Sequence, residues 1–258
     1  MLERAVYPAF RRFDFRGKGR LRRVLPVRAT GTAVIDVAGA RLGLDLRESL
    51  QRDFLFGLYD RRELDLVRAH LRDGDFVDVG AHIGLYTVVA SRATSGRVLA
   101  FEPNPSARVQ LVENVRRNAA TNVVVVPKAV AAAPGRAQLH VPATPDPSFS
   151  SLGAGRFAEG APVDVEVTTV DAEVEAHALR PAFVKVDVEG GELDVVAGMT
   201  RTLAEHRPTL LVEVGEASAA ELARRLAGYS GFRVGRRLEP LESGRGLFNA
   251  LFVPQPPV

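Results

Sequence analysis

The hydrophobic positions of this chain recur with two different spacings. Short apolar runs bounded by glycine, proline or charged residues predict buried strands at 76–79, 97–101, 123–126, 183–188 and 209–214. Apolar residues at helical spacing predict helices over 63–71, 85–93, 106–119, 193–206 and 218–227, the third of them with Ser106 as its N-cap. Strands that alternate with helices predict an α/β fold with a doubly wound, mostly parallel sheet.

A hairpin is predicted at each end of this pattern. Residues 32–37 and 41–46 alternate around a short glycine turn, and residues 232–238 and 247–253 flank a second turn. Strands joined by so short a turn must be antiparallel. We expect a basic leader and N-terminal β-hairpin extension over residues 1–52, followed by the main domain over residues 53–258.

The regular alternation is interrupted after the strand at 123–126, where the following helix is missing. The chain continues instead with a strand at 138–141, a loop rich in proline, serine and glycine at 142–162, and a strand at 163–169. A loop of this length is either a lid over a substrate or a plain surface connection.

Composition narrows the class of protein. The chain has 258 residues, of which 46% are hydrophobic and 25% charged, as in one globular α/β domain with a short extension. The lack of cysteine excludes disulfides, Cys-ligated zinc and thiol catalysis. No apolar run approaches the ~20 residues that a membrane span requires, and residues 1–15 lack the apolar core of a secretory signal. We therefore expect a cytoplasmic protein without a transmembrane segment.

Basic residues are concentrated in the leader, although the net charge is only +3. Between Arg11 and Arg28 there are eight basic residues, opposed only by Asp14. Such a run either binds an acidic partner, such as an anionic or carrier-bound substrate, or is a solvated leader. No RNA-binding motif or aromatic platform accompanies it, so we do not expect a nucleic acid as partner.

The strongest candidate for ligand binding is the turn after the strand at 76–79. Asp78 lies near the end of this strand, Gly80 and Gly84 bracket the turn, and Glu102 directly follows the next strand. A glycine turn before a helix, followed by a strand that ends in an acid, is typical of an adenosine site, where the acid accepts hydrogen bonds from ribose. His82 stands where a dinucleotide-binding loop has its second glycine, which favours S-adenosylmethionine (SAM) over NAD.

A second group of charged residues follows the strand at 183–188. Side chains alternate along a strand, so Lys185, Asp187 and Glu189 are expected on one face at its carboxyl end. Glu192 lies in the first turn of the next helix, and Glu213 near the end of the next strand. These residues form either a catalytic site or a structural charge network, and the sequence leaves both open.

These blocks together resemble a known family, the FkbM-type SAM-dependent methyltransferases of class I, with a Rossmann-like fold. The resemblance covers about residues 46–254 and is carried by the segments 78–84, 100–104, 185–192 with Gly198, and 211–213. It implies transfer of a methyl group from SAM, with S-adenosylhomocysteine (SAH) as product, to a hydroxyl of a sugar, glycolipid or secondary metabolite. The family therefore places the chain in glycan or natural-product biosynthesis.

The resemblance also assigns candidate site residues. Asp78, Gly80 and Glu102 carry over to SAM binding, with His82, Gly84, Pro103 and Asn104 as their neighbours in the same motifs, and Asp187 and Glu189 carry over to the floor of the active site. His82 departs from the asparagine expected at its position, which leaves the role of that side chain open.

Methyl transfer to a hydroxyl also requires a base. Asp187 is the first candidate for this role and Glu189 the second. N-methylation of an amine and SAM binding without turnover are the alternatives, and the acid block at 187–192 argues against an NAD enzyme. Asp187, Glu189 and Glu213 offer the oxygen ligands that Mg²⁺ or Ca²⁺ prefer, but they follow no metal-binding spacing, so no metal is expected.

Overall fold

The computed structural model describes residues 31–59, 61–71, 73–142, 151–152, 160–241 and 246–256. The basic leader up to residue 30 lies outside the described residues, as do most of the predicted loop at 142–162 and the turn at 242–244. None of the helices in the described part is long and apolar enough to cross a membrane.

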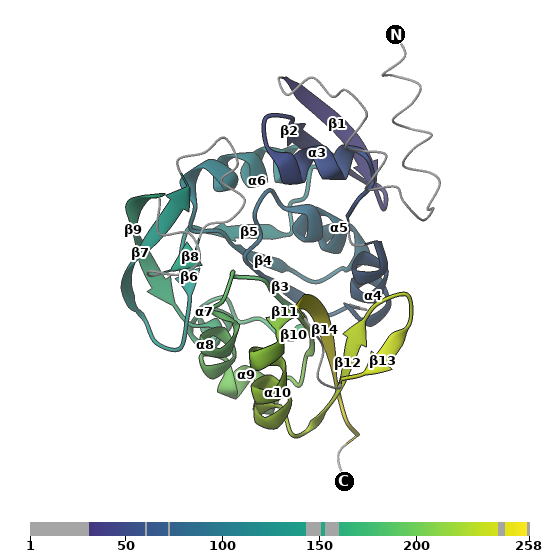
Figure 1. Cartoon of the computed structure of the whole chain (residues 1–258), viewed down its shortest axis with the longest axis vertical. Helices are drawn as coiled ribbons and strands as arrows, with labels where there is room; N and C mark the ends of the chain where they lie inside the picture. Colours follow the sequence, from purple (N-terminus) through teal and green to yellow (C-terminus); the bar gives the residue numbers. More distant parts are fainter. Residues whose placement is uncertain are drawn as a thin grey trace.

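An eight-stranded sheet forms the centre of the molecule (Figure 1), in the order β13-β12-β14-β11-β10-β3-β4-β5. Its parallel strands are β3 (Asp75–Val79), β4 (Val98–Phe101), β5 (Val123–Val126), β10 (Pro181–Val186) and β11 (Thr209–Gly215). The closing strands are β12 (Tyr229–Val234), β13 (Leu238–Pro240) and β14 (Leu247–Pro254), and β14 runs antiparallel between β11 and β12. This confirms the predicted doubly wound, mostly parallel sheet with a closing antiparallel hairpin.

Helices cover both faces of the sheet. One face carries α4 (Arg61–Leu71), α5 (Leu85–Ala93) and α6 (Pro105–Arg117), and the other carries α7 (Val170–Ala176), α8 (Glu192–Ala197), α9 (Thr200–Glu205) and α10 (Glu216–Arg225). The alternation along the strands explains the two layers. Phe76 and Phe183 pack together toward α4 and α5, whereas Val77 and Val184 point into the opposite core.

The predicted N-terminal hairpin is present as β1 (Thr32–Val37) and β2 (Ala40–Asp45), followed by α3 (Ser49–Leu55). The buried side chain of Asn114 on α6 fixes the hairpin to the turn after β3. Its Nδ2 donates to the carbonyls of Ile83 at 2.9 Å and Gly43 at 3.2 Å, and its Oδ1 accepts from the Gly43 N–H at 2.7 Å. Asn114 thereby connects the hairpin to the turn after β3, which is the predicted ligand-binding turn.

A second, four-stranded sheet replaces the missing helix after β5. It consists of β6 (Ala129–Val130), β7 (Gly135–Pro142), β8 (Ser151–Leu152) and β9 (Gly160–Thr168), in the order β6-β9-β7-β8. The sequence predicted two of these strands, β7 and β9, which pair antiparallel. In Figure 1 this sheet lies beside the end of the main sheet that carries β5.

Several predicted boundaries were wrong. The helix predicted at 193–206 is two helices, α8 and α9, broken near Gly198, where a β-carbon would lie 2.2 Å from the carbonyl oxygen of Ala131. The strand predicted at 232–238 is likewise split into β12 and β13, and α3 and α7 were not predicted. β10 ends at Val186, so Asp187 is the first residue beyond the strand rather than part of it.

Candidate active site

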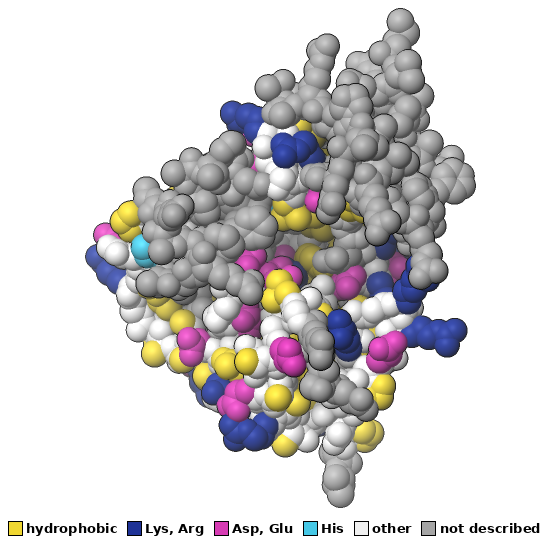
Figure 2. All heavy atoms as spheres, in the orientation of Figure 1, with side chains coloured by type: hydrophobic (Ala, Val, Ile, Leu, Met, Phe, Trp, Pro, Cys, Tyr) yellow, Lys and Arg dark blue, Asp and Glu magenta, His cyan; other side chains and the backbone are white. Residues whose placement is uncertain are grey.

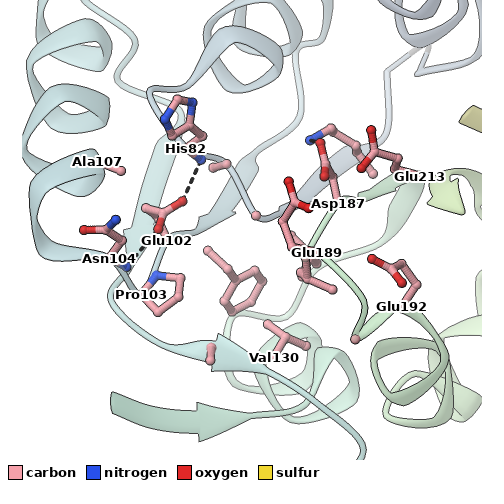
Figure 3. A pocket seen from close by; sticks show the side chains of 18 of the residues that line it. His82, Glu102, Pro103, Asn104, Ala107, Val130, Asp187, Glu189, Glu192 and Glu213 are labelled. Carbon is pink, nitrogen blue, oxygen red and sulfur yellow. Dashed lines mark hydrogen bonds and ion pairs between the residues drawn. The ribbon is translucent and has the colours of Figure 1, made fainter. Parts of the chain in front are cut away.

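A cavity of about 710 Å³ opens where β3, β4, β10 and β11 end, which is where open parallel sheets bind ligands. Figure 2 shows acidic side chains along a hollow near the middle of this face. In Figure 3 two groups of residues face each other across the cavity. His82, Glu102, Pro103 and Asn104 lie on one side, and Asp187, Glu189, Glu192 and Glu213 on the other.

The turn after β3 requires its glycines. Gly80 and Gly84 have φ of +82° and +89°, a region that residues with a β-carbon rarely adopt. A β-carbon on Gly80 would lie 1.8 Å from the carbonyl oxygen of Asp187, and one on Gly84 would lie 2.5 Å from Leu111. His82 also has a positive φ, of +50°, which is the left-handed region that histidine adopts more readily than most residues.

Glu102 is held by the backbone of this turn and of its own loop. Its Oε2 accepts from the N–H of His82 at 2.7 Å, and its Oε1 accepts from the N–H of Asn104 at 2.8 Å. Burial raises the pKa of Glu102 to about 7, against the lowering effect of these two N–H groups. Because a carboxylate offers about four acceptor sites, Glu102 retains capacity for two further donors from a ligand.

Asn104 is the N-cap of α6, a role that the sequence analysis wrongly gave to Ser106. Its Oδ1 accepts from the N–H of Ser106 at 3.0 Å and from the Ser106 hydroxyl at 2.8 Å. Pro103 and Asn104 both line the cavity, so the cap also shapes the wall next to Glu102.

Asp78 lies behind the cavity wall rather than among the residues that line it. Its fully buried carboxylate accepts from the Thr87 hydroxyl at 2.6 Å, and its Oδ1 lies 4.0 Å from the ammonium of Lys185. Burial raises the pKa of Asp78, and Lys185 and Thr87 oppose that rise. The geometry therefore gives Asp78 a structural link to α5 and to β10.

Lys185 is a buried cation at the floor of the cavity. Its Nζ lies 3.1 Å from Oδ2 of Asp187 and 4.6 Å from the centre of the Tyr86 ring. Burial would lower the pKa of Lys185, but the charges of Asp187 and Asp78 outweigh it and raise that pKa above its ordinary value. Lys185 thus joins Asp78 to Asp187 by charge, and both Lys185 and Asp187 line the cavity.

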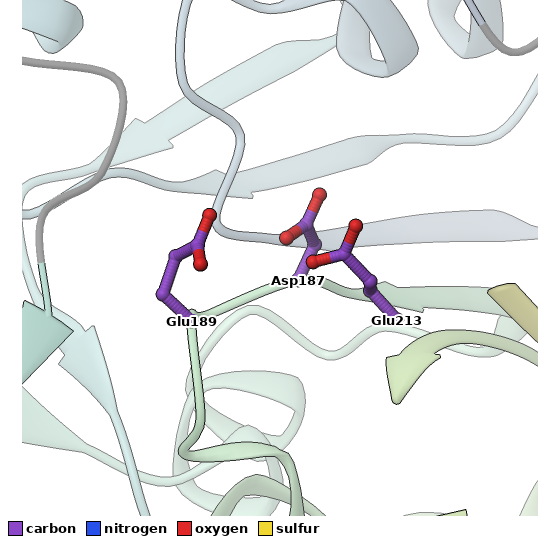
Figure 4. Close-up of side chains that lie close together, drawn as sticks. All are labelled: Asp187, Glu189 and Glu213. Atoms are coloured by element: carbon purple, nitrogen blue, oxygen red, sulfur yellow. The ribbon is translucent and has the colours of Figure 1, made fainter. Parts of the chain in front are cut away.

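Asp187, Glu189 and Glu213 form what we call the acid cluster (Figure 4). Each offers a carboxylate oxygen within 4.8 Å of the others. Glu189 was predicted on the same strand face as Asp187, but its φ of +55° turns the chain away from the strand, and only its long side chain returns to the cluster. Three carboxylates so grouped could hold a cation, and the ammonium of Lys185 already occupies one side of Asp187.

Glu192 has a local partner at the start of α8. Its Oε1 accepts from the N–H of Gly190 at 2.8 Å, and burial raises the pKa of this carboxyl. It therefore fixes the turn that leads out of the acid cluster.

Tyr86 and Lys128 also line the cavity, and neither was predicted as a site residue. Tyr86 on α5 places its ring beneath the Lys185 ammonium. Lys128, between β5 and β6, forms an ion pair with Glu173 at 2.8 Å on the wall made by the second sheet. A lysine two residues after a predicted strand could have been recognised as a candidate, whereas Tyr86 looks like an ordinary helix residue.

A mostly parallel sheet with helices on both faces and a glycine turn at the carboxyl edge of its strands is the arrangement of a class I methyltransferase. The model of the methyltransferase FkbM domain matches residues 78–234, and the chain belongs to this family of methyltransferases.

Two similar proteins illustrate the relationship. The chain is 31% identical over 148 residues to the hexuronic acid methyltransferase AglP of Haloferax volcanii, a match that covers 55% of this chain and 59% of that protein. Among solved structures it is similar to an FkbM methyltransferase from Methylobacillus flagellatus, with a TM-score of 0.49 and 17% identity over 78% of this chain and 52% of the other. The chain thus spans little more than half the length of either protein.

Proposed function

We propose that this chain is a SAM-dependent O-methyltransferase that acts on a hydroxyl of a sugar, glycolipid or secondary-metabolite acceptor. The observation that carries the proposal is that one cavity joins the turn at Gly80, the carboxylate of Glu102 and the acid cluster. A methyl donor and a base are the two elements that transfer to a hydroxyl needs.

The Glu102 side of the cavity fits the adenosine part of SAM. Glu102 is anchored by two backbone N–H groups and is left with acceptor capacity, which suits the two hydroxyls of a ribose. Gly80 lines the cavity and has no side chain to cover its backbone there, and α5 begins directly after the turn, so a ligand can approach the main chain. His82 contributes to this side of the cavity through its backbone, because its N–H donates a hydrogen bond to the Glu102 carboxylate.

The acid cluster fits the part of the site where the methyl group of SAM would meet the acceptor hydroxyl. When bound, SAM supplies the methyl group: a carbon–oxygen bond forms, the carbon–sulfur bond breaks with its electrons kept by sulfur, and the hydroxyl proton must go to a base. Asp187 is positioned for that role, since Lys185 holds its Oδ2 and about a third of its side chain is exposed. Glu189 stands beside it and helps to orient the acceptor.

The charge of the cluster favours a hydroxyl over a carboxylate as the nucleophile. A carboxylate needs no base and would be placed next to like charges, whereas a neutral hydroxyl would both donate a hydrogen bond and lose its proton there. The hexuronic acid that the name of the Haloferax volcanii relative gives as its acceptor carries hydroxyls as well as a carboxylate. A sugar hydroxyl is therefore our first choice of acceptor.

The test is transfer of radiolabel from [methyl-³H]SAM to matched glycosides, with the product identified by mass spectrometry. We expect methylation of a hydroxyl on a neutral glycoside, in preference to the carboxylate of the matching uronide. Asp187→Asn should remove the activity and the exposed control Asp36→Asn should not. SAM binding without transfer to any hydroxyl would contradict the proposal and support a binding protein, and transfer only to amines would make the chain an N-methyltransferase.

A further inference from the structure

Asp187, the first residue beyond β10, lies beside Glu213 of the adjacent parallel strand β11. β10 and β11 are in register with Val186 opposite Val212, so the next residue of each chain segment brings Asp187 next to Glu213. Neighbouring strands lie only ~4.8 Å apart, and carboxylate oxygens of the two residues are within 4.8 Å of each other. The sheet itself thus brings these two acids together.

Few positive charges balance this pair. Lys185 is the ammonium that the described residues place in contact with Asp187, and it also lies 4.0 Å from the buried carboxylate of Asp78 on β3. Glu189 adds a third acid at the cluster. With one ammonium shared among several carboxylates, the cluster has a surplus of negative charge.

Within the described part of the chain, the other elements around Glu213 add no cation to this surplus. β14 places the uncharged Asn249 opposite it, and that side chain reaches Glu63 of α4 at 3.5 Å. On the other face of the sheet α8 contributes Glu192, a further acid that lines the cavity. Two close carboxylates with so little compensation retain a proton between them at neutral pH.

The electrostatics of Glu213 agree with this geometry. Burial first, and then the charges of Asp187 and Glu189, raise the pKa of Glu213 to about 8, while Lys185 opposes the rise. A pKa above neutral pH favours the protonated form of the Glu213 carboxyl, and that form can donate a hydrogen bond to Asp187.

We propose that Asp187 and Glu213 act as one acid pair that holds a single proton in the free protein and releases it to solvent when a sulfonium binds in the cavity. The inference rests on the proposed function, because it takes SAM as the source of the positive charge. Glu213 then acts through Asp187 as the residue that stores the proton, and it becomes part of the proton-transfer step.

The protons and charges of the cycle balance. Binding of the sulfonium cation displaces one proton and leaves both carboxylates ionised. Transfer then moves the methyl group to the acceptor oxygen, the electron pair of the broken bond stays on sulfur, and the hydroxyl proton passes to the pair. The pair is again singly protonated next to a neutral thioether, which is its state in the free protein. The pair is therefore ionised while the sulfur carries a positive charge and singly protonated when the sulfur is neutral.

Calorimetry tests the proposed proton release on SAM binding, and it requires no methyl acceptor. SAM and SAH are each titrated into the whole protein at neutral pH in buffers of different ionisation enthalpy, which gives the number of protons released on binding. We expect SAM to release about half a proton or more beyond SAH, because a neighbouring cation lowers a carboxyl pKa by about 1–3 units. The two ligands share ribose, amino and carboxylate groups, so a proton displaced from Glu102 cancels in the difference. The difference should vanish well above pH 8.

Three variants test whether the released proton comes from Glu213. Glu213→Gln should abolish the SAM-minus-SAH difference, and Glu239→Gln, the same change at an exposed position on β13, should leave it intact. SAH binding by each variant shows that it is folded, and Glu213→Asp should restore part of the difference. Equal proton release with SAM and SAH in the unmodified protein, or a difference that persists in Glu213→Gln, would overturn the inference. Failure of both ligands to bind would instead overturn the proposed function on which it rests.

Discussion

Gly80 and Asp187 are in direct backbone contact: a β-carbon on Gly80 would stand 1.8 Å from the carbonyl oxygen of Asp187. The Asp187 N–H donates to the carbonyl of Val79 at 3.0 Å, and the Gly80 N–H donates to the carbonyl of Phe101 at 3.1 Å. The turn that we assign to the cofactor and the residue that we assign as base are therefore joined by the main chain. A change at one of them must displace the other.

Gly80→Ala should therefore damage both stability and cofactor binding. The left-handed backbone costs ~1–3 kcal/mol for a residue with a β-carbon, and the contact with Asp187 adds to it. We expect a clear fall in Tm and loss of SAH binding by calorimetry. Two control variants separate the effects of backbone conformation and of close contact. Gly190 also has a positive φ, but a β-carbon there would have no atom within 4 Å, and Gly135 has neither a positive φ nor a close neighbour. If Gly80→Ala were no worse than Gly190→Ala, the contact with Asp187 would be unimportant.

Glu102→Gln should weaken SAH binding by ~1.5–3 kcal/mol, the scale of hydrogen bonds to a charged acceptor. The pKa of Glu102 is raised to about 7, so the carboxyl is protonated below that pH and ionised above it. Because the ionised form is the better acceptor for ribose hydroxyls, the affinity of the unmodified protein for SAH should rise as pH increases through about 7. The variant should lack this rise. An unchanged affinity and pH profile in the variant would exclude Glu102 as the ribose ligand.

The same pKa has a consequence for stability. A carboxyl whose pKa is raised on folding stabilises the protein fully below its unfolded pKa and loses that contribution as pH rises through the folded value. The ligand-free protein should therefore lose stability between the ordinary pKa of 4.5 and about 7, and Glu102→Gln should show a smaller loss over this interval. Urea unfolding at several pH values measures it, with Glu239→Gln as the control.

Asp187→Asn should lower turnover ~100-fold or more while leaving SAH affinity within a small factor. Asparagine keeps the shape of the side chain but cannot accept the hydroxyl proton. The measurement is the rate of label transfer from SAM to an accepted glycoside, beside SAH calorimetry on the same preparation. Near-normal turnover would make Asp187 structural, and an unfolded variant would favour the charge-network interpretation.

Lys185→Met should destabilise the protein by ~3 kcal/mol at neutral pH, the cost of removing one partner from a buried ion pair. The buried Asp78 then lacks its cation, and burial already raises the pKa of that carboxyl. As pH falls Asp78 becomes neutral, so the deficit should shrink. Lys128→Met removes the more exposed ion pair with Glu173 and should cost less. A deficit independent of pH would indicate lost packing rather than an uncompensated charge.

The sequence predicted those parts of the fold that depend on local periodicity. The helix at Leu85–Ala93 and the strand at Val123–Val126 have the expected bounds, because their apolar pattern is uninterrupted. The break between α8 and α9 depends on a distant contact of Gly198 with Ala131, which no local pattern reveals. The seven-residue helices α3 and α7 are too short for a periodic signal.

The candidate site was predictable only in part for a similar reason. Motif spacing indicated that Gly80, Glu102 and Asp187 would meet at one edge of the sheet, and they do line one cavity. The pairing of Asp187 with Glu213 depends on β10 and β11 being neighbours in register, which is a property of strand order. That Asp78 lies behind the wall depends on burial, which spacing alone does not determine.

The central claim is that the cavity between Glu102 and the acid cluster binds SAM, and calorimetry on the unmodified protein tests it most directly. SAM, SAH and NAD are titrated separately into the same preparation at neutral pH. We predict binding of SAM and SAH in the micromolar range or tighter and no binding of NAD. Binding of NAD without binding of SAM or SAH would contradict the account.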